Sequence, residues 1–417
     1  MKILMFTNTF TPRLGGVTQS IVSLRQELTK RGHSTLVITS NPSSEVRRET
    51  DVLRVPVLAH TNGADWPLPI ISKRLRKEIQ AFAPDIIHTH HPFLLGRTAL
   101  HAAARFDVPI VYTFHTRYDL YLRALGGGVL LEQLIRRSMM AFCQTADAVI
   151  APSETIRCML QASGLMTPVV TIPSGIDTAR VSGGDRRRMR MALGIKSDAF
   201  VVGHIGRLES EKNLGFLASA AAIFLRKSPE AKFLVGGDGP QRRAMEKILS
   251  EAGVSDQVIF TGAITGRPLA DTFSAMDIFV FASLTETQGL VVTEAQAAGL
   301  PVIALDAPGV HEAVMQGGGW LIATRAKAAA FAKALHSFEQ LAEPERRMLS
   351  EQALNSAAHY SPLKMAQSTE ALYGKLVSEH SPIARRGALR TRIATELRLF
   401  KCLVSPYDTV SSWKQSA

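Results

Sequence analysis

Two glutamates, Glu286 and Glu294, flank a predicted turn into a helix at a spacing that could serve chemistry. Glu286 follows the apolar run 278–281, which predicts a buried strand, and Glu294 lies in a helix-favouring run. A helix that begins at Gly289 and Leu290 would leave free backbone N–H groups, which favour an anionic ligand. The two carboxylates could accept hydroxyl hydrogen bonds on either side of a phosphate, as a sugar nucleotide requires. The alternative is a solvated loop and a helix surface.

Two cations follow a second predicted strand, 200–205. Arg207 and Lys212 lie on the polar loop that leaves it. Two positive charges at such a place could hold a diphosphate and offset the charge of a leaving nucleoside diphosphate. A solvated charged loop without a ligand is the alternative.

A glycine pair near the N-terminus could also approach a phosphate. Gly15 and Gly16 stand between a predicted strand, 3–6, and a helix with apolar residues at helical spacing over 17–28. Glycine allows backbone N–H groups to face a phosphate closely. The full G-x-G-x-x-G spacing is absent, which disfavours a dinucleotide site, and a tight turn is the alternative.

Histidines gather where two further predicted strands end. His115 follows the strand 108–114, at the edge where parallel sheets bind ligands, and is our candidate polar contact to a reacting sugar; the alternative is a loop histidine without a role. His88, His90 and His91 end the preceding strand. Alternation along a strand separates His91 from His90, and no cysteine lies nearby, so we predict no metal site.

Composition describes a globular protein. The chain has 417 residues, 46% hydrophobic and 20% charged, which is enough for two or three domains. No apolar run reaches the ~18 residues that a transmembrane helix needs, and the N-terminus does not resemble a signal peptide. Three cysteines without metal-site spacing indicate reduced thiols and a cytoplasmic protein.

The net charge of +12 predicts an anionic partner. The sequence has no zinc spacing and few aromatic residues (6%), so we predict no nucleic acid and favour a phosphorylated ligand or a membrane surface. A predicted helix over 70–82 carries an apolar face flanked by cations, so it could lie on a membrane or pack on a core. These cations are Lys73, Arg74, Arg76 and Lys77.

Alternating strands and helices predict an α/β protein in several parts. We expect an N-terminal domain over 1–177, a Gly-rich and charged linker over 178–198, and a second domain over 199–345. Closing helices over 346–379 follow, the last packing back on the N-terminal domain, and then a basic tail over 380–417 that is either a membrane-binding helix, a core-packed helix or partly disordered.

Four segments together resemble the retaining glycosyltransferases of family 4, over residues 1–376. They are Glu286-x7-Glu294, the 206–213 segment Gly-Arg-Leu-x-x-Glu-Lys-Asn, Gly15-Gly16, and Thr-Phe-His-Thr at 113–116. The resemblance implies the GT-B fold: two facing Rossmann-like domains with the active site in the cleft. It also implies retention of the anomeric configuration and no need for a metal or cofactor.

The same resemblance implies a role for each candidate residue. Glu294 would bind the ribose hydroxyls and Glu286 the hydroxyls of the donor sugar, with His115 beside that sugar. The diphosphate would be held by the cationic side chains of Arg207 and Lys212. Backbone amides would add to this, at Gly289 and Leu290 and at Gly15 and Gly16.

Within the family, two segments look most like the bacterial diacylglycerol glucosyltransferases. They are the 109–121 stretch, which includes Tyr118 as a candidate acceptor contact, and the 88–96 stretch. We therefore predict transfer of a hexose, glucose from UDP-glucose being favoured, to diacylglycerol or a related lipid at an anionic membrane surface, on the inner face of the cytoplasmic membrane. The alternatives are a soluble or polysaccharide acceptor, as for a mannosyltransferase that uses GDP-mannose, a sugar-nucleotide epimerase, and a non-catalytic binder. The oligomeric state stays open.

Overall fold

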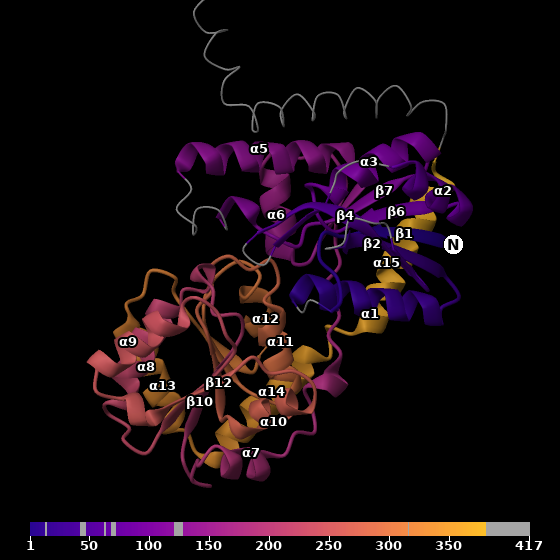
Figure 1. Ribbon diagram of the computed structural model, residues 1–417. Helices are drawn as coiled ribbons and strands as arrows, with labels where there is room; N and C mark the ends of the chain where they lie inside the picture. The colour runs from indigo at the N-terminus through magenta and orange to yellow at the C-terminus, as the bar shows by residue number, and fades with distance from the viewer. Residues whose placement is uncertain are drawn as a thin grey trace, which may run out of the picture. The chain divides into compact units, whose positions relative to one another are not determined.

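The computed structural model describes residues 1–12, 15–41, 47–61, 64–67, 72–120, 128–315 and 317–380 (Figure 1). The chain forms two compact units, one of Met1–Ile172 together with the chain from Leu363, the other of Pro173–Pro362. Each has a sheet between two layers of helices, as the alternation of strands and helices predicts. The predicted basic tail lies outside the described residues from residue 381 onward.

The first sheet is parallel along most of its width. Its strands follow the order β3-β4-β2-β1-β6-β7-β8-β9, with β3 and β5 antiparallel to β4. Because the chain moves outward from β1 to β2 and returns to β6 on the other side, the topological switch point lies between β1 and β6. The strands are β1 (Lys2–Phe6), β2 (Ser34–Asn41), β3 (Arg47–Glu49), β4 (Val52–Thr61), β5 (Ala64–Pro67), β6 (Ile86–Thr89), β7 (Ile110–Thr113), β8 (Ala148–Ala151) and β9 (Val169–Thr171).

Alternation along β1 directs apolar side chains to both faces of this sheet. Leu4 and Phe6 pack under α2 (Lys73–Phe82), α3 (Leu95–Phe106), α5 (Val129–Thr145) and α6 (Glu154–Ala162). Ile3 and Met5 pack under α1 (Gly16–Lys30) and α15 (Pro362–Ser378) on the opposite face (Figure 1). The last described helix therefore belongs to the core of the first unit.

The second sheet is parallel throughout, in the order β12-β11-β10-β13-β14-β15. The chain runs outward from β10 to β12 and returns beside β10 as β13, so the switch point lies between β10 and β13. The strands are β10 (Val201–Ile205), β11 (Lys232–Gly236), β12 (Val258–Gly262), β13 (Ile278–Phe281), β14 (Val302–Leu305) and β15 (Gly319–Ile322).

Helices cover both faces of this sheet too. One core contains residues of α8 (Leu214–Leu225), α9 (Arg242–Glu251) and α13 (Ala328–Glu339). The other contains residues of α7 (Arg186–Ala192), α10 (Arg267–Ala275), α11 (Leu290–Ala297), α12 (His311–Met315) and α14 (Glu343–Ala357). Short 3₁₀ turns complete the unit: η1 (Thr178–Arg180), η2 (Ser210–Lys212) and η3 (Ser255–Gln257).

Residues 178–198, predicted to link the domains, are an integral part of the second unit. They contain η1 and α7, and α7 packs on α10. Arg190 is buried and donates to Asp277 at 2.8 Å, while Arg188 pairs with Asp271. The charged run that suggested an exposed connection instead supplies the ion pairs that hold a helix in place.

Candidate active site

The switch point of the second sheet brings together a lysine and a glutamate. Lys212 lies on the loop after β10, Glu286 lies on the loop after β13, and Lys212 Nζ is 2.6 Å from Glu286 Oε1. Each side chain is less than one-fifth exposed. Burial disfavours the ionised form of Glu286, but the charge and hydrogen bond of Lys212 outweigh it and lower the pKa of the carboxyl. The pair places opposite charges at the edge where open α/β sheets bind ligands.

The loop after β10 carries a second, more exposed cation. The Arg207 guanidinium is 56% exposed and lies 3.2 Å from Glu211 Oε1 and 3.7 Å from Glu209. Asn213 ends this loop in the left-handed conformation, and its Nδ2 donates to the carbonyl of Ala282 at 3.2 Å. The loops after β10 and β13 are therefore joined at their bases, with Arg207 free to reach solvent on one side.

Helix α11 begins beside this pair without a side-chain cap. Gly289 takes the N-cap position with φ +67°, and Leu290 is the first helical residue. The amides of Gly289 and Leu290 are therefore available to an anion, whereas that of Val292 already donates to the Gly289 carbonyl at 2.8 Å. Gly309, from the loop after β14, has φ +75°, and a Cβ there would lie 2.5 Å from the carbonyl carbon of Thr287. Only glycine allows the two loops to pack this closely.

Glu294 lies on the second turn of α11. Burial raises the pKa of its carboxyl to about 7, although the charge of Arg180 partly opposes the shift. Within the described residues the side chain of Glu294 makes no hydrogen bond or ion pair, whereas its backbone carbonyl accepts from the Ala298 N–H as part of the helix. A half-buried carboxyl that the protein leaves without a hydrogen bond is suited to pair with ligand hydroxyls.

Gln288 also takes part in this site, and the sequence analysis missed it. The side chain is buried; its Oε1 accepts from the Ser174 N–H at 2.7 Å, and its Nε2 donates to the Ser174 carbonyl at 2.9 Å. The amide thereby ties the site loop to the segment where the chain enters the second unit. The sequence carries little sign of this contact, because the partner lies 114 residues earlier.

The glycine pair lies at the switch point of the first sheet. Gly15 is extended and Gly16 begins α1, which has no side-chain cap, so its first amides are available to a ligand. Asn8, on the same loop after β1, accepts from the Leu95 N–H through its Oδ1 at 3.1 Å. The loops after β1 and β6 are joined there as their counterparts are in the second unit.

His115 lies at the same edge of the first sheet, after β7. It is half-buried, and its Nε2 lies 3.0 Å from Nδ1 of His90. Burial, and then the neighbouring His91 and His88, lower the pKa of His115 well below its usual value, so the ring is neutral at pH 7. Tyr118, the candidate acceptor contact, packs edge-on against Phe93 at 5.3 Å.

The sequence falls within a known family. The profile "Glycosyltransferase Family 4" matches residues 14–180, and "Glycosyl transferases group 1" matches residues 185–356. An alpha-monoglucosyldiacylglycerol synthase of Streptococcus pneumoniae is 32% identical over 314 residues, which cover 73% of this chain and 71% of that protein. The chain belongs to glycosyltransferase family 4.

Other similarities agree with the family and the fold. A GDP-mannose-dependent alpha-mannosyltransferase of Mycobacterium tuberculosis is 31% identical over 323 residues, covering 75% of this chain and 81% of that protein. Sucrose-phosphate synthase of Thermosynechococcus elongatus is 22% identical, with a TM-score of 0.73 over 90% of this chain and 99% of that one. Anabaena HepE, solved with UDP-glucose, has a TM-score of 0.69 at 20% identity, covering 90% and 100%. The predicted GT-B fold class is confirmed.

The basic helix of this glycosyltransferase packs its apolar side on the core. Leu75 and Ile79 of α2 are buried. The cationic side faces outward, with Lys73, Arg74 and Lys77 exposed and Arg76 half-buried. Among the described residues, no helix combines the length and apolar character needed to cross a membrane. Any membrane contact of α2 would therefore use its charges.

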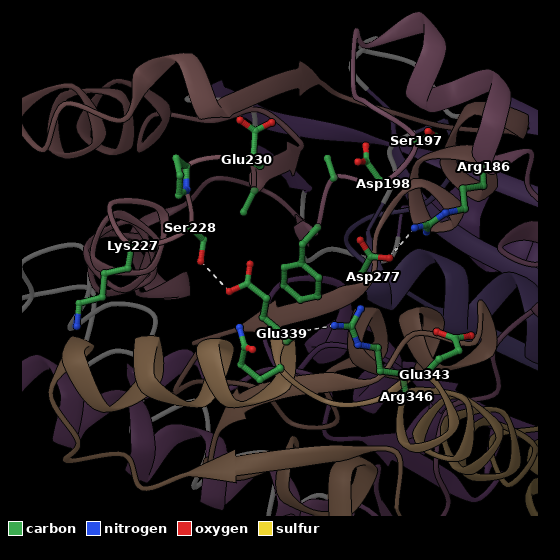
Figure 2. A pocket seen from close by; sticks show the side chains of 15 residues that line it. Arg186, Ser197, Asp198, Lys227, Ser228, Glu230, Asp277, Glu339, Glu343 and Arg346 are labelled. Atoms are coloured by element: carbon green, nitrogen blue, oxygen red, sulfur yellow. Dashed lines mark hydrogen bonds and ion pairs between the residues drawn. The ribbon is translucent and has the colours of Figure 1, made fainter.

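A cavity of about 640 Å³ lies at the opposite end of the second sheet (Figure 2). The segments that precede β10, β11 and β13 line it. Two of its polar contacts are between lining residues: Arg186 donates to Asp277 at 2.5 Å and Ser228 to Glu339 at 2.7 Å. Because ligands of parallel sheets bind at the carboxyl ends of the strands, we do not place the glycosyltransferase donor here.

Proposed function

We propose that this glycosyltransferase moves a hexose, with glucose from UDP-glucose as the first candidate, to diacylglycerol or a related membrane lipid. The observation that carries the proposal is the similarity to alpha-monoglucosyldiacylglycerol synthases, 32% identical in Streptococcus pneumoniae and 28% in Acholeplasma laidlawii, each over 73% of this chain. The site at the second switch point would supply the polar groups that such a donor needs. The protein would then work on the inner face of the cytoplasmic membrane.

The donor's diphosphate would be bound by positive groups of the second unit. Lys212 and Arg207 supply two charges, and the uncapped first turn of α11 supplies N–H groups at Gly289 and Leu290. Glu294 would accept hydrogen bonds from the ribose hydroxyls, which its lack of a protein partner supports. The amides at Gly15-Gly16 would give further contacts to phosphate.

Glu286 would bind the hydroxyls of the sugar itself. Its pKa is lowered, so it is a carboxylate at neutral pH and accepts hydrogen bonds only. Lys212 fixes its orientation through the 2.6 Å contact. The neutral imidazole of His115 would contribute a hydrogen bond to the same sugar.

We infer that the transfer retains the anomeric configuration. The bond from C1 of the sugar to the phosphate oxygen breaks, and the acceptor oxygen bonds to C1 on the same face. The acceptor's proton passes to the departing phosphate oxygen. Lys212, Arg207 and the α11 N-terminus would offset the charge that develops on the leaving diphosphate, so this reaction scheme uses no metal or cofactor.

A lipid acceptor requires a membrane-facing surface, and our candidate is the exposed side of α5 in the first unit. Val129 and Leu130, in the first turn of α5, are 68% and 71% exposed, and Arg136 and Arg137 are exposed on the following turns. Helix α2, with its outward cations, packs on the same face of the first sheet (Figure 1). Exposed aliphatic side chains beside cations suit an anionic lipid interface.

The test is transfer of radiolabelled sugar from UDP-glucose, UDP-galactose and GDP-mannose into an organic-extractable product, with diacylglycerol in anionic vesicles. We expect label from UDP-glucose in the organic phase. Label from GDP-mannose alone would favour the second candidate function, mannosyl transfer, which the 31% identity to a GDP-mannose-dependent enzyme supports. Donor consumption with label left in water would indicate a soluble acceptor or epimerisation. Donor binding without turnover would indicate a non-catalytic protein.

A further inference from the structure

Four aromatic side chains of the first unit form a buried column that ends at His115. The ring centroids of Tyr373 and His88 lie 5.7 Å apart, those of His88 and His90 4.1 Å, and those of His90 and His115 5.3 Å. Tyr373 comes from α15, and the histidines come from β6 and the ends of β6 and β7. Tyr373, His88 and His90 are at most 2% exposed, so water does not compete for their polar atoms.

Hydrogen bonds at the far end of the column fix the proton of His88. The Tyr373 hydroxyl lies 2.5 Å from His88 Nδ1, and His88 Nε2 lies 2.7 Å from Thr113 Oγ1. Burial lowers the pKa of His88 to about 3, so the ring is neutral and carries one proton. His88 Nδ1 is the only hydrogen-bond partner of the buried Tyr373 hydroxyl among the described residues, so we assign the hydroxyl as the donor to Nδ1, and the ring then donates from Nε2 to Thr113.

His90 has one paired and one unpaired nitrogen. Its Nδ1 lies 3.0 Å from His115 Nε2, whereas its Nε2 is buried and finds no hydrogen-bond partner among the described residues. Burial lowers the pKa of His90 well below its usual value, so this ring also carries one proton. A buried N–H without an acceptor is rarer in folded proteins than an unused acceptor. The proton therefore resides on Nδ1, where it has a partner.

We propose that His90 is a positioning residue that donates its Nδ1–H to Nε2 of His115 and holds His115 in the tautomer with its proton on Nδ1. In this tautomer Nδ1 of His115 acts as a hydrogen-bond donor toward a ligand. The ligand group would be a hydroxyl or phosphate oxygen acting as acceptor. In this arrangement Nε2 is already engaged, so His115 does not serve as a general base through that atom.

The tautomer can be read directly by nuclear magnetic resonance on the full chain with ¹⁵N-labelled histidine. Two-bond ¹H–¹⁵N correlations distinguish a protonated ring nitrogen from an unprotonated one, and His115→Asn assigns the signal. We expect a protonated Nδ1 and an unprotonated Nε2 in His115, although the Nε2–H tautomer predominates for histidine in water. A protonated Nε2 in the wild type would overturn the proposal.

Variants at His90 test whether this residue sets the tautomer. His90→Leu removes the donor, so His115 should move toward the Nε2–H form. His90→Asn places an amide N–H close to the position of Nδ1 and should preserve the wild-type pattern. His101→Asn, on α3 and outside the column, is the control. If His90→Leu folds and the protonation pattern of His115 is unchanged, the proposal is contradicted. If His90→Leu does not fold, His90→Asn decides: loss of the wild-type protonation pattern of His115 in that variant would contradict the proposal.

The consequence for catalysis rests on the proposed function. In the UDP-glucose assay, His90→Leu should lower kcat roughly tenfold, as expected for a hydrogen bond lost in the reacting complex, with little change in KM for the lipid. His90→Asn should recover most of that loss. A wild-type protein that transfers no sugar would refute the proposed function, while the spectra would still decide the tautomer.

Discussion

Lys212 Nζ and Glu286 Oε1 lie 2.6 Å apart although 74 residues separate them in the chain. The contact exists because β10 and β13 are neighbours at the switch point of the second sheet. Neither side chain could be buried alone at low cost, since an unpaired charge at such a place is strongly disfavoured. The pair therefore keeps a carboxylate ionised at a position where ligand hydroxyls would need an acceptor.

Removing the lysine should both destabilise the fold and lower the activity. Lys212→Met leaves Glu286 without the partner that lowers its pKa, so we expect a loss of about 2 kcal/mol in the free energy of unfolding. The proposed contact to the diphosphate would be lost as well, with a fall of ~100-fold or more in kcat. Denaturant unfolding and the transfer assay measure the two effects. Lys247→Met, on the exposed side of α9, is the control.

A second substitution separates stability from chemistry. Glu286→Gln added to Lys212→Met removes the unpaired carboxylate, so the double variant should regain most of the stability but none of the activity. Because Lys212 lowers the pKa of Glu286 against the effect of burial, the wild-type pair stabilises the protein fully above the pKa that this carboxyl has in the unfolded chain, and this stability is lost as pH falls through the folded-state pKa. A Lys212→Met variant with wild-type turnover would refute the role of the lysine.

Glu294 should lower the free energy of unfolding at neutral pH, as the cost of a carboxylate that would bind the ligand. Its pKa is near 4.5 in the unfolded chain and about 7 in the folded one, so stability falls as pH rises from 4.5 to 7 and is level above 7. Glu294→Gln removes this loss, so the variant should be more stable than the wild type by up to about 3 kcal/mol at pH 8, with a much smaller gain at pH 5. Thermal unfolding at both values measures this, and a gain of the same size at pH 5 would contradict it.

The same residue should make donor binding depend on pH. Below pH 7 the free carboxyl becomes protonated and loses capacity to accept hydroxyl hydrogen bonds. The diphosphate of a nucleotide sugar does not titrate in this range, so KM for the donor should rise as pH falls through 7. In Glu294→Gln the donor KM should be higher and independent of pH between 6 and 8. A pH-dependent KM in the variant would assign the titration to another group.

The amide of Gln288 should matter for stability more than its place in a loop suggests. Gln288→Leu would remove both hydrogen bonds to the backbone of Ser174, at a cost of about 2 to 4 kcal/mol. Gln80→Leu, at an exposed position on α2, should change stability by less than ~0.5 kcal/mol. Chemical denaturation compares them, and equal stabilities would show that water replaces the lost contacts.

Local patterns in the sequence were enough to predict the strand–loop–helix units, because each apolar run is followed by a polar loop and an amphipathic helix. Glu286 and Glu294 follow β13 as predicted. Contacts between distant segments were not predictable: the Lys212–Glu286 pair depends on strand order, and the His88 contact spans 285 residues to Tyr373. Strands β3, β4, β5 and β15 were not predicted either, and length is not the reason, because β4 has ten residues whereas the predicted β9 has three.

Binding to membranes should depend on the first turn of α5. Leu130→Glu replaces an aliphatic side chain that is 71% exposed with a charge that anionic lipid repels. We therefore expect weaker sedimentation with anionic vesicles and a higher KM for diacylglycerol, with donor hydrolysis unchanged. Met191→Glu, at a position 74% exposed on α7, changes charge equally in the other unit and is the control.

Salt distinguishes the two parts of this interaction. High ionic strength screens the attraction of Lys73, Arg74 and Lys77 for lipid phosphate, so binding of the wild type should fall with salt. Salt does not screen the aliphatic contribution of α5. On neutral vesicles, where the charges contribute little, the wild type should therefore still bind more strongly than Leu130→Glu. Equal binding of the two proteins on both kinds of vesicle would place the membrane contact elsewhere on the protein, because neither the charge nor the side chain at Leu130 would then be at the interface.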